Sequence, residues 1–224
     1  MIRNIIKTSD GSSTIFLPEW QETYHSRHGA IQEAYHVFIN NGLYYYLEHQ
    51  KTNSIQLMEI GFGTGLNCYI TYLESEKSII HIDYVGIEAF PVTEAEFQQL
   101  NYVTALKSIE KKSVFDTIHQ SIWNQKTTIS PQFNLTKRLE KIENITDENS
   151  FDLIYFDAFG AQVQPELWTE IIFKKMYKAM KTNGILVTYA AKGSVRRSMQ
   201  AVGFQVERLP GPPGKREMLR AQKL

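Results

Sequence analysis

The chain has 224 residues, 24 Lys and Arg against 24 Asp and Glu, and a single cysteine. This length suits one large domain with a substantial core, and one cysteine excludes an intrachain disulfide, so we expect a reducing, cytoplasmic setting. No run of about 20 apolar residues occurs and the N-terminus is too polar for a signal peptide, so no membrane span is expected.

The charges are unevenly distributed along the chain. From Lys174 to the end there are twelve Lys and Arg and two acidic residues, so this segment carries +10 and the remainder −10. Such asymmetry predicts a surface that faces a polyanion. The alternative is a solvated basic helix face, which we favour for the four lysines at positions 174, 175, 178 and 181.

The first 50 residues predict an extension ahead of the main sheet. The turn signal Asp10-Gly11 separates segments 5–8 and 14–17 and indicates a β-hairpin. A polar loop and a helical stretch follow. The loop carries His25 and His28, but no cysteine or further histidine completes a zinc ligand set, so we expect no metal.

From residue 55 onward, strand and helix patterns alternate, which predicts a mostly parallel sheet with helices on both faces. The expected parallel strands are 55–60, 82–88, one within 133–142, 151–156 and 185–190. The expected helices are 66–76, one or more within 93–119, 166–181 and 194–202. The final strands, 204–209 and 216–221, have no helix between them and must pair antiparallel if adjacent. We therefore expect an α/β domain with a seven-stranded sheet ending in an antiparallel hairpin. It forms a single domain over 1–224, with an extension at 1–50 and a core at 51–224.

Three alternate glycines, Gly61, Gly63 and Gly65, follow the first parallel strand. Glycine permits positive φ and lets a ligand approach the backbone. Dinucleotide sites prefer G-x-G-x-x-G, whereas this spacing, with Glu59 two residues ahead, is typical of S-adenosylmethionine enzymes. Glu88, which ends the second strand, is expected to take the ribose hydroxyls. These features predict the Rossmann-like fold of class I S-adenosylmethionine-dependent methyltransferases; a tight turn without a ligand is the alternative.

The fourth parallel strand ends in Asp157-Ala158-Phe159. Ligands of open α/β sheets bind outside the carboxyl ends of the strands, so Asp157 is the candidate for chemistry. Methyl transfer needs an aligned, unprotonated nucleophile, and a carboxylate can hold an amine and accept its proton. The alternative is that Asp157 is a helix cap or turn residue, which leaves Phe159 unexplained.

Two basic pairs, Arg196-Arg197 and Lys215-Arg216, are candidates for contacts to phosphate or to a base edge. The second pair follows the connector Pro210-Gly211-Pro212-Pro213-Gly214. An ordinary basic start to a helix or strand is the alternative for both.

With these residues in view, the chain resembles the methyltransferases that complete 5-methylaminomethyl-2-thiouridine in the tRNA wobble position, as a stand-alone, MnmD-type form of the methyltransferase domain of MnmC. The most specific pieces are Glu22-Thr23-Tyr24-His25-Ser26 and Lys215-Arg216-Glu217-Met218, beside the glycine stretch and Asp157-Ala158-Phe159. The resemblance implies that Asp157 is the catalytic carboxylate. It also implies that the Tyr24–Ser26 loop folds over the cofactor and that Lys215-Arg216 lies on the tRNA side.

The expected reaction is methylation of the exocyclic amine of 5-aminomethyl-(2-thio)uridine in the anticodon stem-loop, with S-adenosyl-L-methionine as the cofactor and without a flavin oxidase half. Expected cofactor contacts are Tyr24, Ser26, Glu59, Gly61, Gly63, Thr64, Gly65, Asn67, Glu88 and, more weakly, Glu140 near the adenine. Expected substrate contacts are Phe159, Arg196, Arg197, Lys215 and Arg216. A monomer is favoured.

Three other functions remain open: methyl or aminopropyl transfer to a small amine, a non-catalytic binding module, and a nucleotide-dependent oxidoreductase. Ala161 and Gln164 stand where the family often has proline and asparagine, which leaves the geometry of the substrate loop open.

Overall fold

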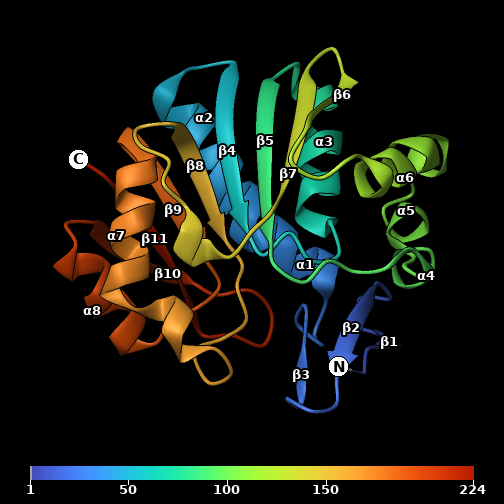
Figure 1. The fold of residues 1–224 in the computed structure, drawn as a ribbon, viewed down its shortest axis with the longest axis horizontal. Coiled ribbons are helices and arrows are strands. Elements are labelled where there is room, and N and C mark those ends of the chain that lie inside the picture. The colour runs from blue at the N-terminus through green and yellow to red at the C-terminus, as the bar shows by residue number, and fades with distance from the viewer. Residues whose placement is uncertain (1) are drawn as a thin grey trace.

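The computed structural model describes residues 2–224 as two β-sheets with surrounding helices (Figure 1). The large sheet has the strand order β10-β11-β9-β8-β4-β5-β7-β6. Its strands are β4 (Ser54–Ile60), β5 (His81–Glu88), β6 (Lys126–Ser130), β7 (Phe133–Leu139), β8 (Phe151–Phe156), β9 (Met180–Thr188), β10 (Gln205–Pro210) and β11 (Glu217–Gln222).

Five of these strands, β4, β5, β7, β8 and β9, run parallel, and β10 and β11 form an antiparallel pair beyond β9. The mostly parallel sheet with a terminal hairpin is therefore confirmed. The chain leaves β4 towards β5 on one side and returns to β8 on the other. This reversal places a topological switch point at the carboxyl ends of β4 and β8, where such sheets bind ligands.

Several details differ from the prediction. The sheet of the described chain has an eighth strand, β6, which pairs antiparallel with β7 from a half-exposed edge, so its sequence lacks an apolar pattern. In addition, β9 begins at Met180 rather than residue 185, because Met180 is buried and pairs with Phe151. Asn183-Gly184, just after the helix expected over 166–181, lies inside β9 in the stretch where its register against β8 shifts.

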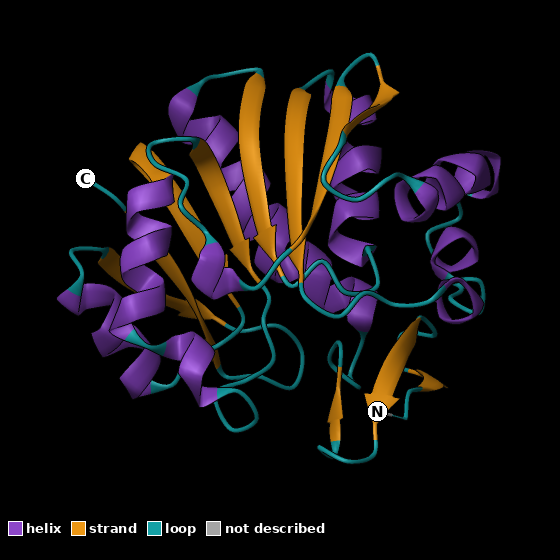
Figure 2. Ribbon diagram, viewed as in Figure 1, coloured by secondary structure: helices purple, strands orange, loops and turns teal. Residues whose placement is uncertain are grey.

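Helices cover both faces of the sheet (Figure 2). One apolar cluster packs α3 (Leu66–Ser78), α6 (Lys112–Gln120) and the N-terminal helical run against one face, and the other packs α7 (Glu170–Ala179) and α8 (Gly193–Ala201) against the opposite face. The N-terminal run is α1 (Ala30–Ala34), the π-helical η1 (Tyr35–Tyr44) and α2 (Tyr45–Gln50). Short helices are α4 (Glu94–Phe97), α5 (Tyr102–Ala105), η2 (Ile109–Lys111), η3 (Ile142–Asn144) and η4 (Pro165–Trp168). No helix within residues 2–224 has the length and apolar character needed to cross a bilayer.

The N-terminal hairpin gains a third strand, so the small sheet contains β1 (Asn4–Lys7), β2 (Ser13–Leu17) and β3 (Glu22–Thr23). It lies beyond the carboxyl ends of the parallel strands (Figure 1). Asn101 ties it to the core: its side-chain oxygen accepts from the Ser13 backbone N–H at 2.7 Å, and its amide donates to the Gly11 carbonyl at 2.9 Å. The small sheet is thus fixed over the switch point.

Replacing Asn101 with alanine should lower the free energy of unfolding by about 2–3 kcal/mol, because it leaves the Ser13 N–H and the Gly11 carbonyl without their partner. Urea unfolding followed by circular dichroism measures the change. The same substitution at the exposed Asn40 is the control. Equal stability of the two variants would show that Asn101 does not anchor the small sheet.

Candidate active site

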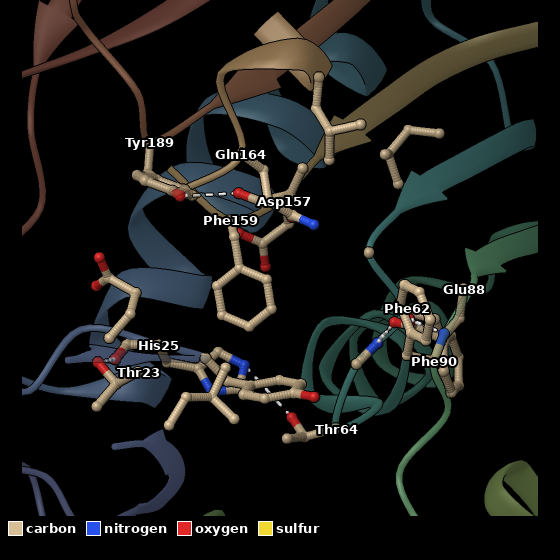
Figure 3. Close-up of a pocket in the computed structure, with 18 of the residues that line it drawn as sticks. Thr23, His25, Phe62, Thr64, Glu88, Phe90, Asp157, Phe159, Gln164 and Tyr189 are labelled. Atoms are coloured by element: carbon tan, nitrogen blue, oxygen red, sulfur yellow. Dashed lines mark hydrogen bonds between the residues drawn. The ribbon is translucent and has the colours of Figure 1, made fainter. Parts of the chain in front are cut away.

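A cavity of about 770 Å³ opens at the switch point, within the size range of small-molecule sites (Figure 3). The carboxyl ends of β4, β5 and β8 form its inner wall, and the loop that follows the small sheet forms the outer wall. Residues expected for the cofactor and residues expected for the substrate line this same space. The predicted site residues that line the cavity are Tyr24, Ser26, Gly61, Gly63, Thr64, Asn67, Glu88, Glu140, Asp157, Phe159 and Lys215.

The glycine turn brings the backbone close to the end of β8. Gly61 has a φ of 85°, and a Cβ built there would lie 2.6 Å from the Asp157 carbonyl oxygen. The N–H groups of Gly61 and Phe62 both donate to the Ile87 carbonyl at 3.0 Å. Only glycine therefore fits the first position of this turn.

Glu88 and Glu140 lie at the carboxyl ends of β5 and β7. The Glu88 carboxylate accepts from the N–H groups of Gly63 and Phe90, each at 2.8 Å, which fixes its orientation in the cavity wall. The Glu140 N–H donates to the Glu88 carbonyl at 3.1 Å, and its carboxylate lies 3.7 Å from Arg138. The two acids expected to meet a nucleoside therefore lie beside each other.

Glu59 occupies a different place from the one expected. It is 1% exposed, lies beneath the cavity rather than in its lining, and accepts from the Tyr84 hydroxyl at 2.7 Å and the Asn67 amide at 2.9 Å. Burial raises its pKa well above the usual range of a carboxyl. Glu59, predicted as a cofactor contact, is therefore linked to the cavity through its hydrogen bond to Asn67, which does line it.

Asn67 bridges Glu59 and Asp157. Its amide nitrogen also donates to Asp157 Oδ2 at 2.8 Å, while its Oδ1 is buried and finds no partner among the described residues. Burial, and secondarily the charge of Glu33, raises the pKa of Asp157 to about 7, while the Asn67 bond and Lys215 act in the opposite direction. Asp157 is thus a cavity carboxyl that exchanges its proton near neutral pH.

The Tyr24–Ser26 loop is attached to the glycine turn by His25. The two ring nitrogens of His25 lie 3.2 Å from the Thr14 hydroxyl and 3.3 Å from the Thr64 hydroxyl, and Tyr102 donates to Thr64 at 3.0 Å. Burial lowers the pKa of His25 to about 4, so its ring is neutral. His25 is therefore a structural tie, and it shares no metal-binding cluster in residues 2–224.

Aromatic rings form the outer part of the cavity. Phe159 makes edge-to-face contacts with Tyr24, at a centroid distance of 5.0 Å, and with Trp20, at 5.4 Å. In Figure 3 its ring points into the space between Asp157 and His25. Gln162, which follows β8 in the chain, donates to Glu22 of β3 at 3.0 Å. This bond links the segment after β8 to the small sheet.

Of the four predicted basic residues, the structure brings only Lys215 to the cavity. Its ammonium pairs with Glu33 and lies 3.7 Å from the Tyr189 ring centroid, while Glu33 also accepts from the Ser26 N–H at 2.8 Å. The other three lie outside the lining: Arg196, Arg197 and Arg216. Lys215 thus pairs with a buried acid in this structure, and its expected contact to tRNA stays a prediction.

Three residues of the site were absent from the prediction. Tyr189 directly follows the strand end Thr188, so its place at the carboxyl edge could have marked it. Trp20 and Glu33 carry no local signal, because both reach the cavity only through tertiary packing.

A family model described as S-adenosyl-L-methionine-dependent methyltransferase matches residues 106–224, which include Asp157. The tRNA 5-methylaminomethyl-2-thiouridine biosynthesis bifunctional protein MnmC of Actinobacillus pleuropneumoniae is 24% identical over 96% of this chain and 34% of that protein. The MnmC of Ralstonia nicotianae is 28% identical over 92% of this chain and 32% of that protein. The chain thus spans about one third of these relatives, and the predicted resemblance is confirmed.

Two solved structures show the same fold. MnmC2 from Aquifex aeolicus superposes with a TM-score of 0.76 at 22% identity, covering 99% of this chain and 70% of that one. Spermidine synthase from Thermotoga maritima gives a TM-score of 0.53 at 14% identity, over 100% and 72%. The predicted Rossmann-like fold is confirmed.

The buried, neutral His25 should make stability depend on pH. Between pH 6.5 and about 4 the unfolded imidazole binds a proton that the folded one does not, so the free energy of unfolding should fall as the pH falls, by up to about 3 kcal/mol. Chemical denaturation from pH 7 to 4.5 measures this slope. His25→Gln should reduce it, whereas the same change at the exposed His81 should not; identical slopes would contradict the role of His25. Burial also lowers the pKa of His119, to about 3, so part of the pH dependence of stability should remain in both variants.

Proposed function

The chain belongs to the S-adenosyl-L-methionine-dependent methyltransferases, and we propose that it methylates the exocyclic amine of 5-aminomethyl-(2-thio)uridine at the tRNA wobble position, giving 5-methylaminomethyl-(2-thio)uridine. The observation that carries the proposal is Asp157, a carboxyl with a pKa of about 7 beside the glycine turn. The similarity to the MnmC proteins over most of this chain supports tRNA as the substrate.

The cavity fits S-adenosylmethionine on its own features. The buried, unpartnered Oδ1 of Asn67 is an acceptor for a cationic amino group, and the glycine turn leaves backbone open to a ligand. Glu88, held by two backbone N–H groups, has acceptor capacity left for ribose hydroxyls. We assign the cofactor contacts to these residues with Tyr24, Ser26, Thr64 and Glu140, and an indirect role to Glu59 and Gly65.

In this proposal Asp157 prepares the acceptor amine. When bound, S-adenosylmethionine supplies an electrophilic methyl group on a sulfonium sulfur. The amine must offer an unprotonated lone pair to form the new N–C bond; the S–CH3 bond would break with its electron pair left on a neutral thioether, and the alkylated nitrogen then sheds one proton. Asp157 holds the amine, accepts that proton and is itself oriented by Asn67. Its pKa near neutrality suits a base that must both take up and release the proton.

The uridine is proposed to enter between the Tyr24–Ser26 loop and the segment after β8, against the ring of Phe159. A base modified by an enzyme must leave its stack, and aromatic rings are a common support for such a base. Arg196, Arg197 and Arg216 remain proposed contacts to the tRNA backbone, because they lie outside the cavity in the basic C-terminal segment. Lys215 is proposed to act inside the cavity instead.

Incubation with tRNA that carries 5-aminomethyl-uridine and with methyl-labelled cofactor, followed by digestion to nucleosides, tests the proposal. Label should appear in 5-methylaminomethyl-(2-thio)uridine. Activity on a free amine without tRNA would instead favour methyl or aminopropyl transfer to a small molecule, as would turnover that does not fall with added salt.

Asp157→Asn should reduce turnover on tRNA by at least about 100-fold, because the amide cannot accept the proton. Its affinity for S-adenosylmethionine, measured by calorimetry, should remain within about threefold of wild type. Asp116→Asn, on the surface of α6, is the matched control and should keep its activity. Unchanged turnover of Asp157→Asn would remove this residue from the mechanism.

The Glu33–Lys215 pair should shift the pH dependence of the reaction. The rate at limiting substrate should rise with pH through about 7, as Asp157 loses its proton. The positive charge of Lys215 lowers the pKa of Asp157 and the negative charge of Glu33 raises it, so Lys215→Met should move this rise to higher pH and Glu33→Gln to lower pH. Arg216→Met, outside the cavity, should leave the midpoint in place. Coincident profiles for all the variants would contradict the assignment of the base.

A further inference from the structure

A second cavity, of about 330 Å³, lies behind the glycine turn. Phe62 and Gly63 line both cavities, so the turn forms the partition between them. The other walls come from the segment after β5, the end of α6 and the end of β7. These walls contribute Pro91, Val92, Glu94, Phe97, His119, Gln120, Trp123 and Lys137. The proposed reaction uses none of these residues.

Lys137 is the unusual residue in the lining of this cavity. It is 1% exposed, and the hydrogen bond that its ammonium makes is to the His119 carbonyl. Across the described residues, no carboxylate lies within ion-pairing distance of it. An ammonium has three N–H donors, and a buried charge without a counter-ion is strongly unfavourable. Lys137 therefore offers a charge and donors that the protein does not satisfy.

The side chains around Lys137 are mostly aromatic rings. Its ammonium lies 4.8 Å from the Trp123 ring centroid and 6.0 Å from that of Phe62. The His119 ring stacks on Phe97 with centroids 4.3 Å apart, and its Nε2 is buried without a partner. Such walls suit a planar apolar body that carries an acceptor group.

We propose that this second cavity binds a small aromatic monocarboxylate, with the carboxylate on Lys137 and the ring against the aromatic walls. A single ammonium balances one negative charge, and Glu94, the acidic residue in the lining, disfavours a dianion such as phosphate. The volume lies at the lower end of small-molecule sites, which restricts the ligand to about the size of benzoate.

Occupancy of this cavity should also act on the cofactor site. Gly63 donates to Glu88, the proposed ribose acceptor, and Phe62 separates the two spaces. A ligand that holds Phe62 and Gly63 in one conformation therefore fixes the shape of both cavities at once. By linkage, the two ligands must then change each other's affinity by the same factor.

Benzoate is the probe, titrated into wild-type protein by calorimetry at constant ionic strength, with inorganic phosphate in a parallel titration. Benzoate should bind and phosphate should not. Lys137→Met, which keeps the unbranched side chain up to the ε position but removes the ammonium, should weaken benzoate binding by about tenfold or more. Lys126→Met, at a side chain that is 57% exposed on the edge strand, should bind benzoate like wild type.

Three results would overturn the proposal: no benzoate binding by wild type, equal binding by Lys137→Met, or binding of phosphate in preference to benzoate. If Lys137→Met does not fold, NMR of the wild-type protein decides. Intermolecular NOEs should connect benzoate to the ring protons of Trp123 and Phe97, and their absence counts against the site. None of these readouts uses tRNA or methyl transfer, so a failure here leaves the proposed reaction unaffected.

Discussion

The approach of the glycine turn to the end of β8 is the constraint on which the site depends. Gly61 has no side chain, so its backbone lies against the Asp157 carbonyl, while the Asp157 N–H donates to Ile60 at 2.9 Å and the turn bonds to Ile87. Three strand ends are thereby tied together by main-chain groups. The acid at the end of β5 and the carboxyl at the end of β8 consequently keep a fixed separation, whatever the outer loops do.

Two acids share one amide beneath this turn, and their environments separate their properties. Glu59 is enclosed, and burial raises the pKa of its carboxyl, which disfavours a second negative charge next to Asp157. Asp157 lies at the cavity wall and titrates near neutrality. Asn67 orients both through its nitrogen and leaves its oxygen for a ligand. One small hydrogen-bonded unit thus contains both the carboxyl proposed as the base and the amide oxygen proposed to bind a cationic group.

The sequence was sufficient for the parallel core, because apolar strands and the Gly61–Gly65 spacing are local signals. It was also sufficient to place Glu88 and Asp157 in the cavity wall, which follows from the rule that ligands meet the carboxyl ends of strands. It failed for β6, whose half-exposed edge lacks an apolar pattern, and for Glu59, where spacing could not distinguish a wall residue from a buried one. The partner of Lys215 could not be foreseen either, since a pairing across the whole chain leaves no mark in its local residues.

That pairing has a consequence for how the protein matures. Glu33 and Lys215 are separated by 182 residues, and their contact joins the first helix to the connector before the last strand. On the ribosome, the early segments emerge and begin to fold long before Lys215 leaves the exit tunnel. The outer wall of the cavity can therefore acquire its final anchor only after the chain has been synthesised past Lys215. Truncated or stalled chains would then lack a closed pocket even with every glycine of the turn in place.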